Sequence, residues 1–110
     1  GRTRRKGDLV MAAVEQGDLL KVQGIAQPVI VVSNSFFNQS GMAILCPIAQ
    51  RAIPSPLHIE LHDAPVEGYV LCEFVRSVDL SSRSFSKLSS THYFDVMDIS
   101  DAVMGIFDYQ

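Results

Sequence analysis

Four β-branched residues in a row constrain the fold of this chain more than any other feature. Residues 29–32 read Val-Ile-Val-Val and follow a proline. β-Branched side chains favour extended backbone, and a continuous apolar run is typical of a strand that is buried on both faces. Residues 42–48 form a second apolar run of this kind. The sequence therefore predicts a sheet whose central strands, at 28–33 and 42–48, are covered.

Weaker patterns predict the remaining strands and loops. Residues 57–62 alternate Leu, Ile and Leu with His, Glu and His, which is typical of a half-exposed strand. We also expect strands at 8–14 and 68–76, a loop at 34–41, and a Ser-rich turn at 81–87. Residues 19–24 fit either a hairpin arm or a loop.

The last segment has the period of a helix. Its apolar residues recur at steps of three, four and three: Val96, Ile99, Val103 and Ile106. Ser89, Ser90 or Thr91 is expected to cap this helix, with Asp95, Asp98 and Asp101 along its polar side. Strands followed by one helix predict a mainly β fold with α, a small antiparallel half-open barrel packed by a C-terminal helix.

Charge and length point to a single domain with a short basic arm. The 110 residues suffice for one domain, which we place at 7–110. Residues 1–6 carry four positive charges, as a phosphate-binding arm or a solvated tail would. The net charge of −3 argues against tight non-specific binding of nucleic acid. With no apolar run long enough to cross a membrane, we expect a soluble cytoplasmic protein.

Several site classes are not indicated. Cys46 and Cys72 form no CxxC pair, so neither zinc nor a disulfide framework is expected, and both thiols are predicted to be buried. The nucleotide-binding patterns GxxxxGK[ST] and GxGxxG and the zinc-protease pattern HExxH do not occur. No His, Asp or Glu cluster has ligand spacing, so we expect no metal and no cofactor.

Five short elements, taken in order, resemble the MazF/PemK toxins. They are KGDLV at 6–10, PVIVVS at 28–33, FN at 37–38, CPI at 46–48 and VRSVDL at 75–80. Members of that family read GD(I/L)V, RPxxVxS, FN, PxT and (V/P)R(T/S)(I/V)D. The similarity runs from about residue 7 to the end of the chain. Its strength lies in the order and spacing of the elements, because no one of them is specific.

The resemblance implies a homodimer of SH3-like barrels that cleaves single-stranded RNA without a metal. Cognate antitoxins of this family inhibit by laying a segment along the RNA groove. Cleavage requires a base for the ribose 2′-hydroxyl and a positive charge that stabilises the phosphorane. The family supplies an Arg in RPxxVxS and a hydroxyl in PxT. This chain has Gln27 and Ala49 at those positions, so both expected catalytic side chains are replaced.

Two residues of the strand predicted at 68–76 are candidates for the missing chemistry. Glu73 stands where some relatives carry an acidic residue, and burial with a raised pKa would make it a general base. A surface carboxylate on an edge strand is the alternative. Arg76 matches the Arg of the last family element and is a candidate phosphate ligand. Its alternative role is an ion pair with Asp79.

Further polar residues are candidate ligands of RNA or of an antitoxin. His58 and His62 share one face of the alternating strand, which suits an acid–base pair or a plain solvent face. Ser33, Asn38 and Gln39 crowd the loop after the first buried strand, where polar groups read unstacked bases. Gln27 is included as a hydrogen-bonding residue. We expect one or both of Phe36 and Phe37 to plug the core or the dimer interface rather than stack on bases.

A function without catalysis is the alternative. In relatives a mobile loop corresponding to 15–27 covers the groove, and here that stretch is apolar, which favours a protein ligand. The chain would then be a silent member that binds an antitoxin, or one that acts like the CcdB toxins on gyrase. The apolar and acidic terminus at 106–110 loosely resembles the CcdB arrangement. A stand-alone interaction domain is a third possibility.

Overall fold

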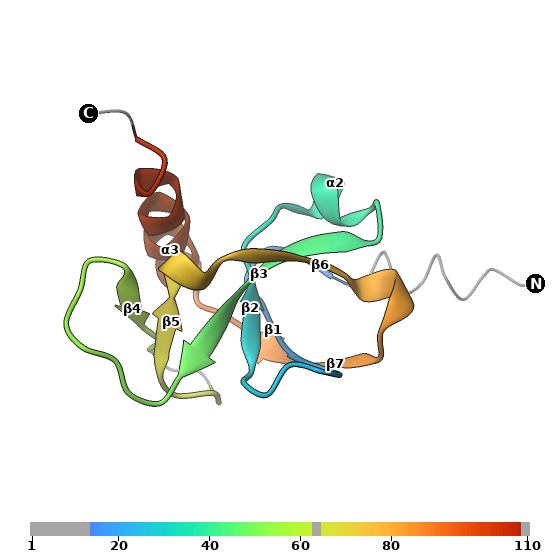
Figure 1. Cartoon of the computed structure of the whole chain (residues 1–110), viewed down its shortest axis with the longest axis horizontal. Coiled ribbons are helices and arrows are strands. Elements are labelled where there is room, and N and C mark those ends of the chain that lie inside the picture. Colours follow the sequence, from blue (N-terminus) through green and yellow to red (C-terminus); the bar gives the residue numbers. More distant parts are fainter. Residues whose placement is uncertain (1–13, 63–64, 109–110) are drawn as a thin grey trace, which may run out of the picture.

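The predicted antiparallel sheet is present, in a computed structural model that describes residues 14–62 and 65–108 (Figure 1). The strands are β1 (Asp18–Val22), β2 (Val29–Val31), β3 (Met42–Ala49), β4 (His58–Glu60), β5 (Tyr69–Leu71), β6 (Arg76–Asp79) and β7 (Phe85–Ser90). The helices are α2 (Ser35–Asn38) and α3 (Tyr93–Gly105), and two 3₁₀ turns are η1 (Cys72–Phe74) and η2 (Leu80–Ser82). The strand predicted at 8–14 and the basic arm at 1–6 lie outside the described residues, except for Val14.

Strand β3 organises the sheet. The strand order is β4-β5-β3-β2-β1-β7, and β6 pairs with β3 outside this path. The first half of β3 pairs with β6, from Met42 opposite Asp79 to Leu45 opposite Arg76. Its last two residues pair with β5, so the turn η1 fills the gap between the two partners. All the pairings are antiparallel and give an open sheet, in agreement with the half-open antiparallel barrel that the sequence predicts.

Apolar side chains cover both faces of this sheet, as the two buried runs predict. On one face Leu20, Val29, Val31 and Leu45 belong to a first cluster of buried residues. On the other face Leu19, Ile30, Cys46 and Val70 form a second cluster that includes Ile99 of α3. β2 and β3 contribute to both clusters by alternation. Figure 1 shows α3 beside β4 and η1, the elements that it contacts.

The C-terminal helix forms, but its details differ from the prediction. Ile99 is buried, Val96 and Val103 are half-buried, and Ile106 is exposed beyond the end of the helix. The N-cap is His92, whose side chain makes no capping bond, and not Ser89, Ser90 or Thr91. Those three residues are held in or next to β7. None of the described helices is long and apolar enough to cross a bilayer.

Two segments predicted as loop or turn are regular structure. Residues 34–41 include α2, a single turn whose cap Asn34 accepts a hydrogen bond from the Phe37 amide at 2.9 Å. Residues 81–87 hold most of η2 and the start of β7, an edge strand with three serines among its six residues. Hydrophobic alternation misses β7 because its backbone pairing with β1, rather than burial of its side chains, fixes it.

The stretch at 15–27 is not the apolar cover that we expected. Its apolar residues Leu19, Leu20 and Val22 lie in β1 and are buried in the core. Ile25 is also buried, at the end of a turn in which its amide donates to the Val22 carbonyl at 3.1 Å. The apolar character of this stretch therefore reflects a strand, and it is no argument for a protein ligand.

Candidate functional site

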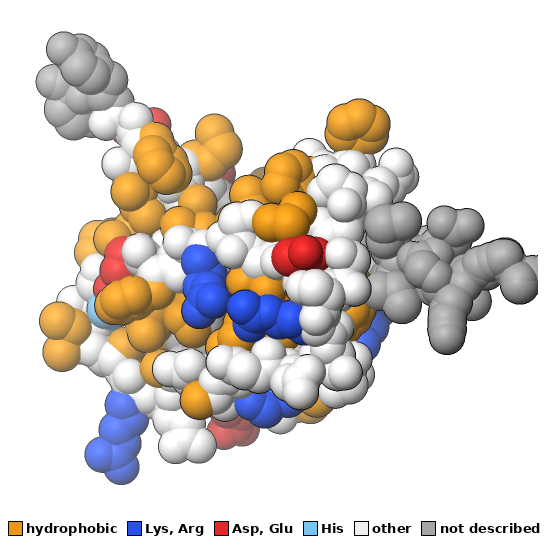
Figure 2. Space-filling view, turned by 45° about the vertical axis from the view of Figure 1, so that its right-hand side comes forward, with side chains coloured by type: hydrophobic (Ala, Val, Ile, Leu, Met, Phe, Trp, Pro, Cys, Tyr) orange, Lys and Arg blue, Asp and Glu red, His pale blue; other side chains and the backbone are white. Residues whose placement is uncertain are grey.

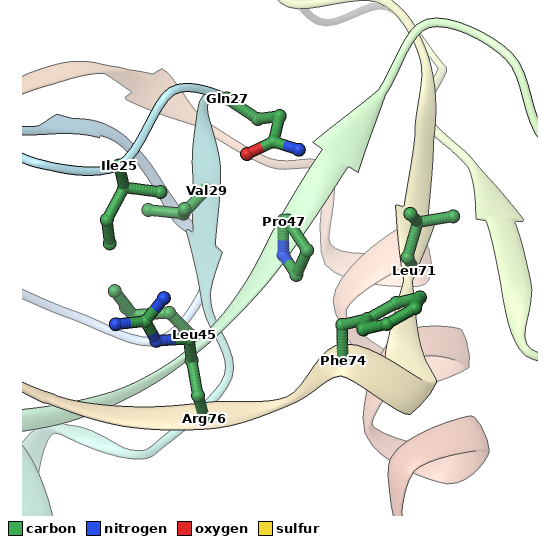
Figure 3. A pocket seen from close by; sticks show the side chains of 8 residues that line it. All are labelled: Ile25, Gln27, Val29, Leu45, Pro47, Leu71, Phe74 and Arg76. Atoms are coloured by element: carbon green, nitrogen blue, oxygen red, sulfur yellow. The ribbon is translucent and has the colours of Figure 1, made fainter.

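A hollow of about 310 Å³ lies between β2, β3 and the end of β5. Its lining is apolar apart from one amide and one guanidinium: Ile25, Gln27, Val29, Leu45, Pro47, Leu71, Phe74 and Arg76. Figure 3 shows Gln27 and Arg76 on opposite sides of this hollow, which we call the β3 hollow. Two residues singled out from the sequence, 49 positions apart, are thus brought to one site.

Local pairing explains why these side chains meet. Arg76 opens β6 directly opposite Leu45, and Val29 of β2 lies opposite Pro47. Gln27 stands just before β2, two residues ahead of Val29. Since β3 carries both Leu45 and Pro47, its one face supplies the floor, and the ends of the neighbouring strands supply the walls.

Ala49, the second replaced position, lies one step beyond the β3 hollow. Side-chain alternation along β3 puts Ala49 on the same face as Leu45 and Pro47, and it pairs with Tyr69. Its methyl group offers no donor or acceptor to a ligand. The Ile48 amide donates to the Pro28 carbonyl at 2.9 Å, so the backbone carrying Ala49 lies beside the backbone carrying Gln27.

Arg76 has its guanidinium available to a ligand. The predicted alternative, an ion pair with Asp79, is not formed: among the described residues no acidic group contacts Arg76. The Asp79 carboxylate instead accepts hydrogen bonds from Ser81, and these hold the pKa of Asp79 below its usual value. On the face drawn in Figure 2, Lys and Arg side chains at the centre border hydrophobic ones.

His58 and Glu73 form an ion pair at the edge of the β3 hollow. His58 lies opposite Leu71, one of the lining residues, and its Nε2 is 2.8 Å from the Glu73 carboxylate. The other ring nitrogen, Nδ1, faces the Ile53 carbonyl oxygen at 2.6 Å. Two acceptors suit a ring that donates from both nitrogens, so the Glu73 hydrogen bond, reinforced by Ile53, raises the pKa of His58.

The hydrogen bond from His58 also lowers the pKa of Glu73, whereas the buried general base considered from the sequence would have a raised one. Glu73 is exposed on η1 and not buried in a strand. Desolvation, which would have favoured the neutral acid, is too weak there to oppose the neighbouring imidazole. Glu73 is therefore a carboxylate fixed by His58, and it is a weaker base than a buried glutamate with a raised pKa would be.

The histidine pair is not formed, because the two rings have different partners. The backbone amide of His62 donates to Asp95 Oδ2 at 3.0 Å, and its Nδ1 lies 3.3 Å from Asp95 Oδ1. Asp95 is buried in the first turn of α3 rather than on the polar side that we expected. It ties the helix to the end of β4, which a pattern within the helix alone cannot reveal.

Ser33 and Asn38 have structural surroundings. Both are buried, the Ser33 hydroxyl donates to the Asn38 side chain, and the Ile44 amide donates to Ser33 Oγ. They fix α2 against β3 and present no free edge for a base. Gln39 is exposed at the end of α2. Phe36 is 84% exposed and Phe37 39%, so neither lies in the core of this chain.

Phe74 was missed by the sequence reasoning. It is exposed to 58% and forms one wall of the β3 hollow between Glu73 and Arg76. A strand reading of 68–76 gave no reason to single it out, because the turn η1 that presents it has no periodic signal. Among the described residues no three His, Cys, Asp or Glu side chains are grouped to hold a metal ion.

Comparison with known proteins decides the family. A model of the PemK-like, MazF-like toxins of type II toxin–antitoxin systems matches residues 5–107. This chain belongs to the PemK/MazF toxin family. The endoribonuclease toxin ChpB of Escherichia coli is 35% identical over 85 residues, which are 71% of this chain and 72% of ChpB.

Solved structures of PemK/MazF-type toxins share the fold. MazF in a MazE–MazF complex from Deinococcus radiodurans superposes with a TM-score of 0.78 at 24% identity, covering 86% of this chain and 95% of that one. A mycobacterial endoribonuclease in complex with its cognate antitoxin gives 0.77 at 15% identity, covering 89% and 100%. The fold predicted from the resemblance is thereby confirmed.

Proposed function

We propose that this toxin cleaves single-stranded RNA at the β3 hollow, with Arg76 supplying the positive charge that relatives place at position 27. One observation carries the proposal: Arg76 and Gln27 line the same hollow, and no acidic group among the described residues neutralises Arg76. A guanidinium on the opposite wall can reach the same phosphate from the other side. Gln27 then serves as a neutral donor.

The chemistry follows from these groups. The ribose 2′-oxygen attacks the adjacent phosphorus, its proton passes to the Glu73 carboxylate, and the 5′-oxygen leaves and takes a proton from water. The products are a 2′,3′-cyclic phosphate and a 5′-hydroxyl end. Arg76 stabilises the charge on the phosphorane, while His58 keeps the carboxylate at the edge of the hollow. Because its pKa is lowered, Glu73 makes this proton transfer slow.

The proposal includes the partners and the place of action. A cognate antitoxin would bind at the β3 hollow. Complexes with an antitoxin have been solved for MazF of Deinococcus radiodurans and for the mycobacterial endoribonuclease. Assembly as a homodimer, a cytoplasmic location and independence of metals belong to this proposal too. We keep Gln39 as a candidate base contact, since it is exposed at the end of α2.

Cleavage of an unstructured RNA in EDTA tests the proposal. We expect Arg76→Ala to lower the cleavage rate by about 100-fold or more, because one electrostatic contact to the transition state is lost. Arg51→Ala is the matched control: it removes an exposed arginine from the loop between β3 and β4 and leaves the β3 hollow intact. Equal rates for the Arg76 variant and the parent would refute the site assignment.

A silent toxin that acts by binding protein is the second candidate. It is favoured by the mostly apolar lining of the β3 hollow and by the exposed Phe74, together with the replacements at Gln27 and Ala49. A gyrase-type target reached through the C-terminal end belongs to this candidate. If the Gln27→Arg/Ala49→Thr protein cleaves RNA and the parent does not, the second candidate replaces the first.

A further inference from the structure

Lys21 of β1 is hydrogen-bonded to the middle of the β1–β2 connection, residues 23–28. It is the exposed residue of β1, in a strand whose other members are buried. Its ammonium group donates to the carbonyl oxygens of Ile25, at 2.7 Å, and of Ala26, at 2.8 Å. The next residue is Gln27, so Lys21 holds the backbone directly ahead of a lining residue of the β3 hollow.

The other side of this connection is fixed as well. The Gln23 amide donates to the Ser84 carbonyl at 2.9 Å, and the Arg83 guanidinium reaches the Gln23 carbonyl at 3.4 Å. Within the turn, the Ile25 amide donates to Val22. The carbonyls of Ile25 and Ala26, by contrast, accept their hydrogen bonds from one side chain, that of Lys21.

We propose that Lys21 is a positioning residue for ligand binding: its ammonium keeps residues 23–28 in place so that Ile25 and Gln27 form a wall of the β3 hollow before the RNA arrives. The choice of RNA as the ligand rests on the proposed function. The claim that Lys21 holds residues 23–28 does not depend on it. A preformed wall spares the ligand the entropic cost of ordering it, so affinity depends on this lysine although it lies outside the hollow.

Removing the ammonium is expected to loosen the loop and weaken binding without altering chemistry. In Lys21→Met, we expect the Ile25 amide to exchange its hydrogen about tenfold faster. The Kd for a 2′-O-methyl oligoribonucleotide, which cannot be cleaved, should rise about tenfold as the competent loop becomes a minor state. At saturating unmodified RNA the cleavage rate should change less than twofold. Lys21→Arg should restore both values, because a guanidinium also donates to two carbonyls.

Two further variants separate positioning from charge and from unfolding. Lys87→Met removes the same charge from β7, where Lys87 pairs with Asp18 and does not touch residues 23–28. If it weakens RNA binding as much as Lys21→Met does, loss of charge explains the effect and the proposal is wrong. Lys21→Gln repeats the removal with a shorter polar side chain, in case the methionine variant does not fold.

The exchange rate and the RNA measurements fail independently. Unchanged exchange of the Ile25 amide in both Lys21→Met and Lys21→Gln overturns the role of Lys21, whatever the RNA does. Faster exchange with an unchanged Kd also overturns it, since the loop would then not matter for binding. If the parent itself neither binds nor cleaves RNA, the proposed function is wrong, and the exchange rate alone decides whether Lys21 holds the loop.

Discussion

At the scale of single residues, the His58–Glu73 pair makes stability depend on pH. The pKa of His58 is raised above 6.5, so its contribution is complete below pH 6.5 and is lost as pH rises through the folded-state pKa. The pKa of Glu73 is lowered below 4.5, so its contribution is present above pH 4.5 and is lost as pH falls through the folded-state value. The pair therefore stabilises the fold most between pH 4.5 and 6.5.

Urea unfolding across pH measures this dependence. The difference in free energy of unfolding between the parent and Glu73→Gln should be largest between pH 4.5 and 6.5 and should shrink at pH 3 and pH 9. Glu60→Gln is the control, because Glu60 is exposed on β4 and has no ion pair among the described residues. A difference that does not vary with pH would show that the pair contributes nothing to stability.

The two cysteines give a second prediction at this scale. Cys46 and Cys72 are free, fully buried and members of one core cluster. The neighbouring Cys72 side chain, reinforced by burial, raises the pKa of the Cys46 thiol. We expect neither thiol to react with a disulfide reagent in the native protein, and both to react within minutes in denaturant. Rapid reaction of one thiol without denaturant would contradict the burial.

Residue identities could be predicted from sequence only where a family pattern marks a position. The resemblance singled out Gln27, Ala49 and Arg76, and the structure brings all three to one face or hollow. It could not foresee that Glu73 would have His58 as a partner, 15 positions away, because such a pair depends on how β4 meets η1. Side-chain pairing across strands has no local signal in the sequence.

At the scale of secondary-structure elements, two glycines predict opposite effects of one added methyl group. Gly68 has φ +143° directly before β5, and a Cβ there would collide with the carbonyl oxygen of Ala49. Gly68→Ala should therefore destabilise the protein by about 2–4 kcal/mol. Gly105, in the last turn of α3, has free space around it, and Gly105→Ala should be neutral or stabilising by up to about 1 kcal/mol. The melting temperatures of the two variants, compared with that of the parent, measure these effects. A larger loss for Gly105→Ala than for Gly68→Ala would contradict the close contact between residue 68 and Ala49.

Elements with many apolar residues were predictable and polar ones were not. The runs at 28–33 and 42–48 and the helix at the C-terminus follow from composition and period. By contrast, β7 is an edge strand that pairs with five residues of β1 and has mostly exposed side chains. Its serines therefore led to the prediction of a turn. Likewise, η1 interrupts a strand that the sequence continues through 68–76.

At the scale of the whole molecule, net charge limits how RNA binds. The chain carries −3 overall, while the β3 hollow presents one guanidinium. Counterion release from a single contacted phosphate predicts a slope of about −0.7 when log K for the single-stranded 2′-O-methyl oligonucleotide is plotted against log salt. Binding measured from 50 to 400 mM KCl gives this slope. A slope steeper than about −3 would indicate that other cations, such as those at residues 1–6, contact phosphates as well.

The position of β3 also determines how this toxin could be divided. The loop at 50–57 separates β1–β3 from β4–α3, yet β3 pairs across that boundary with β5 and β6, and β1 pairs with β7. A chain cut after Arg51 would leave two fragments, each exposing the sheet edges that the other completes. We expect neither fragment to fold alone and the two to fold together when they are mixed. Gln27 would come from one fragment and Arg76 from the other, which would make toxicity a readout of whether two fused proteins meet.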